Sequence, residues 1–387
     1  MNKNWQTKKL GDVCKVIAGQ SPDGKFYNKA GEGVPFYQGK KDFTEKYIGE
    51  PSVWTTEITK EADEGDILMS VRAPVGPVNF ATKRICIGRG LAAIRSGKDI
   101  DKDFLFYFLQ SFEKEIVGNS GAVFNSINKR QIENIKILLP SLFEQKRIVK
   151  TLDEIFEKLE KAKVNTEINI DNSKKVLELY LSNELRKAQK CGYEKLLGDV
   201  CEQVEYGSSS KSKPDGKVPV LRMGNIQNGR FDWNKLVYSD NDDEIKKYSL
   251  KYNDVLFNRT NSPELVGKTA IYKGEMSAIF AGYLIRIHRN KKLLDADYLN
   301  YFLNSQMAVD YGRTVFISSV NQANINGQKL KGYPIPVPPI SDQKAIVIKL
   351  DQLSSQTKKL ESIYQKKLAD IEELKKSVLS KAFSGEL

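Results

Sequence analysis

The stretch LLPSLFEQKRIVKTLDEIF, residues 138–156, is repeated in altered form as PVPPISDQKAIVIKLDQLS, residues 336–354. Proline, Gln-Lys, Ile-Val and Leu-Asp recur in the same order, always 198 positions apart. Each copy opens a run without glycine or proline, over residues 142–190 and 340–384, in which charged and apolar residues dominate. A preceding proline, a serine at the N-cap position (Ser141 and Ser341) and an acidic first turn predict one long helix for each run.

The repeat extends over the whole chain of 387 residues. KKLGDVCKV from Lys8 matches EKLLGDVCEQV from Glu194, and DKDFLFYFLQS from Asp101 matches DADYLNYFLNS from Asp295. Because further short matches keep the same order, we interpret the chain as two tandem copies of one unit. The predicted globular domains are residues 1–140 and 191–338, and the predicted long helices that follow them occupy residues 141–190 and 339–387.

Each globular part combines short strands with helix, which is typical of the α+β class. Short β-type runs between turns rich in Gly, Asn and Pro are predicted at residues 66–71, 85–94, 255–258 and 278–287. Residues 104–112 and 298–312 carry a helical pattern. The expected fold is two mixed α/β domains, tandemly duplicated and joined by two long helices.

Heptad spacing predicts which face of each long helix is buried. The second helix can cover the first only by running back antiparallel, which predicts a coiled coil with an approximate two-fold axis. Polar Thr166, Asn169 and Ser173 weaken the first seam before Val176 and Tyr180, and leave open whether the middle of that helix is continuous. The predicted seam residues are Ile148, Leu152, Ile155, Leu159, Ile346, Leu350, Leu353, Leu360, Ile371 and Leu374.

Charge favours a polyanionic partner. The net charge is +12, and the excess is shared, with 21 basic and 17 acidic groups in residues 1–141 and 20 and 16 in residues 191–339. Lys and Arg side chains that neutralise phosphates release condensed counterions, so nucleic acid is the expected partner, and a merely basic surface is the alternative. Four cysteines without a CxxC pair argue against zinc or a disulfide framework and for a reducing cytoplasm. No apolar stretch is long enough to span a bilayer.

Signals for catalysis are weak. His288 is the sole histidine and falls on a predicted strand, where a structural role is expected. SPELVGKTA, residues 262–270, ends like a phosphate-binding loop but has Ser262 where the motif needs glycine. EADEGD, residues 61–66, is an acidic turn rather than a metal site. The sequence therefore favours binding over turnover, with no catalytic residue and no metal ligand.

These features resemble the specificity (S, HsdS) subunit of type I restriction-modification systems over the whole chain. The duplication, the SLFEQKRIV and ISDQKAIV helix entries, the KLGDV-type openings and the ending LKKSVLSKAFSGEL carry the resemblance. It implies a non-catalytic subunit whose two target recognition domains each read half of a bipartite, asymmetric site in double-stranded DNA. The helices would be conserved spacer regions that set the gap and dock two modification (methyltransferase) subunits.

The resemblance also implies what the partners do. The complex would methylate adenine and, with a restriction subunit, cleave DNA, while S-adenosylmethionine, ATP and Mg would bind to partner subunits and no cofactor to this one. Two alternatives remain: a methylation-only complex, and an adaptor with the same helices whose domains assemble methyltransferase subunits without reading sequence.

Polar, glycine-rich loops at matched positions of the two halves are the predicted DNA contacts, because base edges and phosphates are bound by such side chains. A role as turn residues is the alternative for each. Gln145 and Gln343 are expected to tie each long helix to its domain, and docking of the methyltransferase is the alternative. The predicted DNA-binding residues are Gln20, Ser21, Lys25, Tyr37, Gln38, Lys40, Lys41, Arg72, Arg89, Asn119, Ser120, Asn125, Ser208, Ser209, Lys211, Arg222, Asn225, Arg259, Thr260, Asn261, Arg313, Ser318, Asn321 and Gln322.

Overall fold

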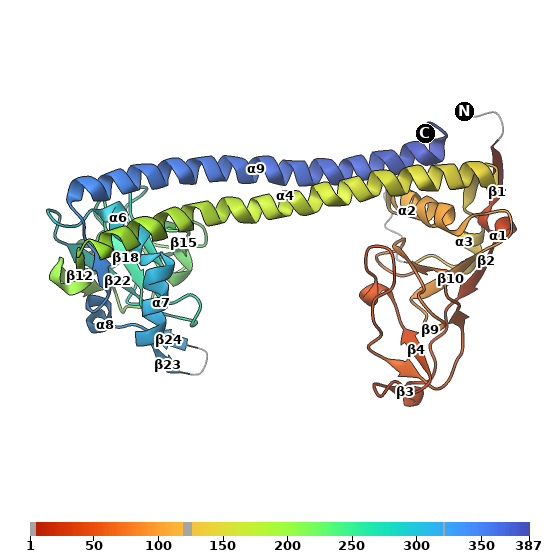
Figure 1. Cartoon of the computed structure of the whole chain (residues 1–387). Helices are drawn as coiled ribbons and strands as arrows, with labels where there is room; N and C mark the ends of the chain where they lie inside the picture. Colours follow the sequence, from red (N-terminus) through yellow and green to blue (C-terminus); the bar gives the residue numbers. More distant parts are fainter. Residues whose placement is uncertain (1–4, 119–125, 320–321) are drawn as a thin grey trace. The chain divides into compact units, whose positions relative to one another are not determined.

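The structure is a computed structural model that describes residues 5–118, 126–319 and 322–387 (Figure 1). It divides into two compact units, Met1–Thr166 with Gln365–Leu387, and Glu167–Tyr364. Each unit holds one globular domain together with parts of both long helices. Within the described residues, no helix is both long and apolar enough to cross a membrane.

The described residues of the first domain form three sheets: one of four strands in the order β2-β10-β7-β8, one of five in the order β3-β5-β4-β9-β6, and the two-stranded sheet β1-β11. Its first strand pairs with its last, β1 with β11, so that the domain closes just before the long helix begins. Its elements are β1 (Gln6–Lys9), α1 (Leu10–Val13), β2 (Cys14–Ala18), β3 (Tyr27–Asn28), β4 (Val34–Tyr37), β5 (Trp54–Thr55), β6 (Glu61–Ala62), β7 (Ile67–Ser70), β8 (Val78–Phe80), β9 (Ile85–Ile87), β10 (Leu91–Ser96), α2 (Lys102–Gly118), α3 (Lys129–Glu133) and β11 (Lys136–Leu139).

The second domain repeats this plan. A four-stranded sheet, β13-β22-β18-β20, matches β2-β10-β7-β8, and β12 pairs with β25 as β1 does with β11. Its elements are β12 (Glu194–Leu196), β13 (Cys201–Tyr206), β14 (Val218–Leu221), β15 (Ile226–Gln227), β16 (Arg230–Phe231), β17 (Val237–Ser239), α5 (Asp242–Tyr248), β18 (Val255–Asn258), β19 (Thr260–Asn261), β20 (Thr269–Ile271), β21 (Ile279–Phe280), β22 (Leu284–Arg289), α6 (Ala296–Leu303), α7 (Gln306–Val315), β23 (Ile317–Ser319), β24 (Gln322–Asn324), α8 (Gly327–Lys331) and β25 (Pro334–Pro336).

The repeated Leu-Gly-Asp-Val turn has the same structural role in both domains. The carboxylates of Asp12 and Asp199 accept the backbone N–H of the residue three positions earlier. A Cβ on Gly11 would lie 3.1 Å from the Glu133 side chain, and one on Gly198 would lie 3.1 Å from that of Lys331. Glycine therefore lets the turn pack directly on α3 and α8, which explains why the motif occurs twice.

Two predicted strands and one predicted helix are each divided in the structure. Residues 85–94 form β9 and β10, and residues 278–287 form β21 and most of β22, because the chain turns at residues 88–90 and 281–283. The pattern at residues 298–312 forms most of α6 and α7, since the Ser305 side chain caps a new helix at Ala308 N–H. Gly88, Gly90 and Gly282 lie in the two strand turns, and the predicted strands ran across them.

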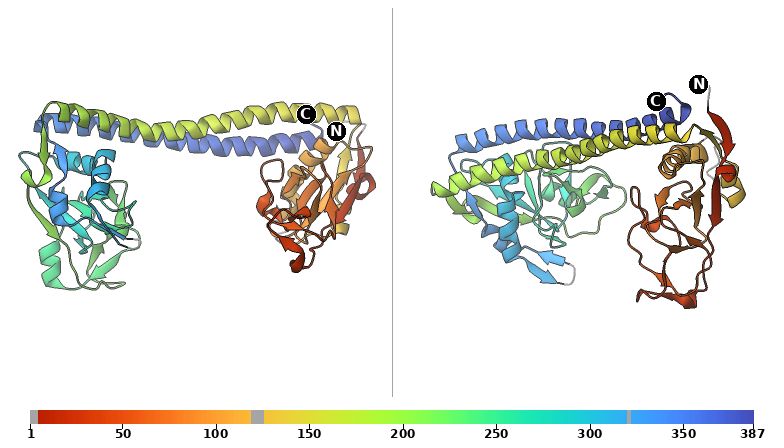
Figure 2. Two further views of the ribbon diagram at one scale, coloured as in Figure 1. Left: turned by 60° about the horizontal axis from the view of Figure 1, so that its bottom comes forward. Right: turned by 45° about the vertical axis from the view of Figure 1, so that its right-hand side comes forward.

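The predicted long helices are confirmed as α4 (Leu142–Lys190) and α9 (Ile340–Ser384). In the first unit, Ile148 and Leu152 near the start of α4 share a core with Leu379 and Ala382 near the end of α9. In the second unit, Leu181 and Leu185 of α4 share a core with Ile346 and Leu350 of α9. The two helices therefore pack antiparallel within each unit, side by side in both views of Figure 2.

Five of the predicted seam residues are buried, namely Ile148, Leu152, Ile346, Leu350 and Ile371, whereas two are exposed. Leu360 and Leu374 are 41% and 49% exposed, so they lie outside the seam. Val176 is also exposed, and Ile170 and Leu177 are buried or half-buried in place of Asn169 and Val176. Ile371 is buried although it lies eleven residues beyond Leu360, so the departures from the heptad pattern are local and do not grow along the helix.

Candidate nucleic-acid interface

The repeated glutamines lie where each long helix leaves its domain. Gln145 Oε1 accepts the Asp101 N–H at 2.7 Å, and its Nε2 donates to Asp99 O at 3.0 Å and Pro140 O at 2.9 Å. Both Gln145 and Gln343 are fully buried. They therefore tie helix to domain, as expected, and burial excludes the alternative in which these side chains dock a partner.

A tyrosine–aspartate pair adds a second tie in each unit. The Tyr107 hydroxyl donates to Asp153 Oδ1, and the Tyr301 hydroxyl donates to Asp351 Oδ1 at 2.6 Å. Burial, together with the hydrogen bond to a carboxylate, raises the pKa of both phenols, so each stays protonated as a donor. Neither pair was predicted, although the Leu-Asp dipeptide and the tyrosine recur at matched positions of the two halves.

Four predicted contact residues gather at the end of β2 in the first domain. Ser21 Oγ donates to Gln38 Oε1 at 2.9 Å and accepts the Arg89 N–H at 3.3 Å. Gln20 is anchored through its backbone N–H to Ile87 O at 2.9 Å. We call Gln20, Ser21, Gln38 and Arg89 the first tip. Apart from half-buried Ser21, these side chains are exposed.

Glycine permits the close strand contact beneath this tip. A Cβ on Gly19 would lie 2.2 Å from Gly88 O, and one on Gly207 in the second domain would lie 2.2 Å from Phe280 O. Any side chain at these positions would push β2 away from the β9–β10 turn, or β13 away from the β21–β22 turn. In both domains glycine therefore allows the strand end to pack against the neighbouring turn. We call this packed end of the sheet the loop platform.

The second domain carries a different set of side chains at its platform. Arg259 stacks over the Tyr206 ring at 4.9 Å, and its Nη1 donates to Gly282 O at 3.3 Å. Asn261 follows it in β19 and lies in the three-stranded sheet β19-β24-β23. We call Tyr206, Arg259 and Asn261 the second tip. Ser318 and Gln322 lie exposed on β23 and β24 of the same sheet.

Several other predicted residues lie apart from the two tips. Arg72 and Ser126 form an isolated β-bridge in the first domain. It lies at the position where Thr260 pairs with Asn324 in the second domain. Lys25 lies 3.8 Å from Asp23, and Arg313 lies 3.5 Å from Asp310. The remaining predicted residues with exposed side chains are Lys40, Lys41, Ser209, Lys211 and Arg222.

Four predicted DNA contacts are corrected by burial. Tyr37 is 1% exposed, and its hydroxyl donates to Gly49 O at 2.8 Å; burial raises its pKa to about 12. Asn225 Nδ2 donates to Asp232 O at 2.9 Å inside a turn. Ser208 Oγ donates to Glu244, and Thr260 Oγ1 accepts from Asn324, both at 2.7 Å. These polar groups are used within the domain, which loop composition alone does not reveal.

Asn119, Ser120, Asn125 and Asn321 lie outside the described residues.

The described residues contain no group of three or more His, Cys, Asp and Glu side chains that could hold a metal ion. His288 Nε2 lies 2.9 Å from Glu205 Oε2, which also binds Arg286, so the histidine belongs to a structural ion-pair network. Thr269 is fully buried in β20, and no helix follows it directly, so SPELVGKTA is not a phosphate-binding loop.

Comparison with known proteins identifies the class. The family model for the type I restriction modification DNA specificity domain matches residues 2–169 and 193–372, so the chain belongs to that family. The two matches coincide with the two halves of the duplication.

Two individual relatives show the degree of sequence similarity. The putative type I restriction enzyme MjaX specificity subunit of Methanocaldococcus jannaschii is 44% identical over 188 residues, which cover 48% of this chain and 44% of that protein. The match thus spans less than half of that relative. The EcoKI specificity subunit of Escherichia coli is 26% identical over 319 residues, which cover 78% of this chain and 68% of that protein.

Two solved structures share the fold. A chain from a study titled as the structural basis of complex assembly and conformational transition of the type I R-M system has a TM-score of 0.76 at 18% identity. The alignment covers 100% of this chain and 99% of that one. The HsdS subunit from Thermoanaerobacter tengcongensis has a TM-score of 0.61 at 17% identity, over 100% and 98% of the two chains.

Proposed function

We propose that this chain is the sequence-specific DNA-binding subunit of a type I restriction-modification complex. Each domain reads one half of a bipartite, asymmetric target, and the long helices set the unread gap between the halves. The observation that supports this most directly is a comparison of the two domains: both join their long helix in the same way, but their tips differ. Gln145 and Gln343 make the same hydrogen bonds, whereas Arg89 in the first tip and Arg259 in the second have different neighbours.

Two domains with the same fold and different tip residues suit a target whose two halves differ in sequence. Arginine, glutamine, asparagine and serine are side chains that read base edges in the major groove, and both tips are built from them. A palindromic site would need equal tips. We therefore propose that the tip side chains bind base edges directly.

Two modification subunits dock on α4 and α9 in this proposal and carry out adenine methylation. A methyltransferase must flip its target base out of the duplex, so a separate subunit that positions the DNA contributes to the reaction without a catalytic residue of its own. S-adenosylmethionine is bound by the modification subunits. ATP and Mg are bound by the restriction subunits that complete the cleaving complex.

Sequencing of modified adenines in cells with and without this gene tests the proposal. We expect deletion of the gene to abolish methylation at one gapped, asymmetric motif, and re-expression to restore it. A chain in which residues 1–140 come from a relative with another target should change one half of the motif and leave the other. An unchanged methylome after deletion would support the adaptor alternative and contradict the proposal.

A further inference from the structure

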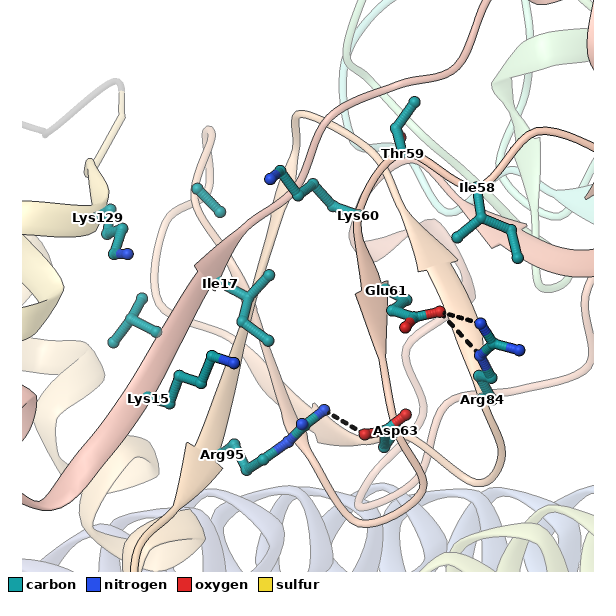
Figure 3. A pocket seen from close by; sticks show the side chains of 12 residues that line it. Lys15, Ile17, Ile58, Thr59, Lys60, Glu61, Asp63, Arg84, Arg95 and Lys129 are labelled. Carbon is teal, nitrogen blue, oxygen red and sulfur yellow. Dashed lines mark hydrogen bonds and ion pairs between the residues drawn. The ribbon is translucent and has the colours of Figure 1, made fainter.

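A positively charged groove lies beside β2 in the first domain, outside the tip residues (Figure 3). Its volume is about 640 Å³, and it is open to solvent. Five cationic side chains line it, and only two acidic ones, Glu61 and Asp63, do so. The cationic residues are Lys15, Lys60, Arg84, Arg95 and Lys129.

The two arginines are neutralised, whereas Lys15 and Lys60 are not. Arg84 Nε donates to Glu61 Oε2 at 2.8 Å, and Arg95 Nη2 lies 2.6 Å from Asp63. Lys129 has a looser partner outside the groove lining, Glu133 at 3.6 Å. Among the described residues, Lys15 and Lys60 have no ion pair, and both are exposed. The groove therefore offers free ammonium groups to an anion.

The second domain lacks this charge at the corresponding place. Ile17 lies opposite Ala93 in the register of β2 with β10, and Glu205 occupies the matching position opposite Arg286 in β13 with β22. By the same register, Gln203 replaces Lys15. Glu205 Oε2 accepts from Arg286 Nη2 at 2.6 Å and so neutralises that face. The fold itself does not require a lysine at this position, because the second domain has the same four-stranded sheet with Gln203 there.

The groove leads to the first tip. Ile17 and Ala18, at the end of β2, line it and directly precede Gly19 and Gln20. On its other side, the Thr59 hydroxyl donates to Gln20 O. A strand of nucleic acid whose bases meet Gln20 would thus pass its backbone near Lys60 and Lys15.

We infer that this groove binds the phosphate backbone of the DNA duplex next to the bases read by the first tip. The inference rests on the proposed function. Lysine ammonium groups bind phosphate as point charges, and such contacts fix register while carrying no sequence information. The groove therefore supplies sequence-independent affinity on one half of the target, and Gln203 replaces Lys15 at the matching position of the second domain.

The full chain in complex with its modification subunits provides the test. Affinity for two fluorescent duplexes, one with the motif found by methylome sequencing and one without it, is measured over a series of salt concentrations. The variant is Lys15→Gln with Lys60→Gln. The matched control is Lys98→Gln with Lys136→Gln, two exposed lysines of the same domain outside the groove.

The slope of log K against log salt is negative, and each phosphate contact adds about 0.9 to its magnitude. We therefore expect the magnitude of the slope to be smaller by about 1.8 in the groove variant, which loses two contacts. This decrease in magnitude should be the same on both duplexes, and the methylated motif should be unchanged. The control variant should keep the wild-type slope. A groove variant with the control's slope overturns the inference. Equal affinity of the wild-type complex for the two duplexes instead contradicts the proposed function, so the two failures are distinguishable.

Discussion

The side-chain amides of Gln145 and Gln343 make the same three hydrogen bonds, one set in each half of the chain. Gln343 Oε1 accepts the Asp295 N–H at 2.8 Å, and its Nε2 donates to Leu293 O at 2.8 Å and Pro338 O at 2.7 Å. In both halves the amide joins the first turn of a long helix to the loop before a domain helix. Buried amides of this kind have no water to replace a lost partner.

Replacement of either glutamine by alanine should destabilise one unit of the chain. Each substitution leaves one N–H and two carbonyls without their side-chain partner, and one of these carbonyls, that of Pro140 or Pro338, is in a buried hydrogen bond. An unsatisfied buried group costs about 1–3 kcal/mol. We expect Gln145→Ala to lower the melting transition of the first unit and Gln343→Ala that of the second. Calorimetry of the full chain measures both transitions, since two units need not unfold together.

Gln352→Ala is the matched control for both variants, because Gln352 is exposed on α9 and alanine is the better helix former. A Gln145 variant as stable as this control would show that the junction does not depend on the buried amide.

The seam seen in the structure can be separated from the seam predicted by the heptad pattern. Leu350 is fully buried and Leu360 is 41% exposed, although both were assigned to the seam. We expect Leu350→Ala to cost about 2–5 kcal/mol, the usual range for a buried leucine. Leu360→Ala should fall within about 0.5 kcal/mol of wild type, as surface substitutions do. Denaturant unfolding of the two variants side by side decides this, and equal losses would favour the heptad assignment.

The ion-pair network around Glu205 predicts a pH-dependent stability. Burial raises the pKa of Glu205, but hydrogen bonds from His288 and Arg286 outweigh it and lower the pKa overall. A lowered folded pKa stabilises the protein above the unfolded value of about 4.3, and this contribution is lost as the pH falls through the folded pKa.

Glu205→Gln should therefore be less stable than wild type at pH 7, by about 1.5 kcal/mol, the lower end for a hydrogen bond to a charged group. The loss is limited because Arg286 keeps its second carboxylate partner, Asp254, at 3.0 Å. The difference should shrink as the pH falls below about 4. Thermal unfolding between neutral and acidic pH measures it, with Glu202→Gln, an exposed change on the same strand, as the control. A difference that is constant with pH would rule out the carboxylate as its source.

The length of the helices should set the gap in the methylated motif if they separate the two readers. Removal of one heptad from the middle of each, residues 164–170 with 362–368, leaves the Gln145 and Gln343 junctions and their aspartates intact. Seven residues of helix span about 10 Å, so the unread gap should shorten by about three base pairs at about 3.4 Å each. Methylome sequencing reads the result, and an unchanged gap with intact half-sequences would contradict a spacing role.

Much of the candidate site was accessible from sequence because the chain repeats itself. The glutamines of the junction, the loops around Gln20 and Arg259, and both long helices were predicted from matched positions and from runs without glycine or proline. Burial of Tyr37 and Asn225 was not predicted, because a polar residue in a glycine-rich loop can turn inward when a carbonyl lies within reach.

By itself the sequence determined the duplication, the two long helices and the place where each helix joins its domain. These follow from local rules, since helix formation and capping depend on residues a few positions apart. Only the tertiary structure decided which seam residues are buried, that β9 and β10 belong to different sheets, and that Lys15 faces a groove with uncompensated charge. Those properties depend on strand register and on packing between distant segments, as the contrast between Lys15 and Gln203 shows.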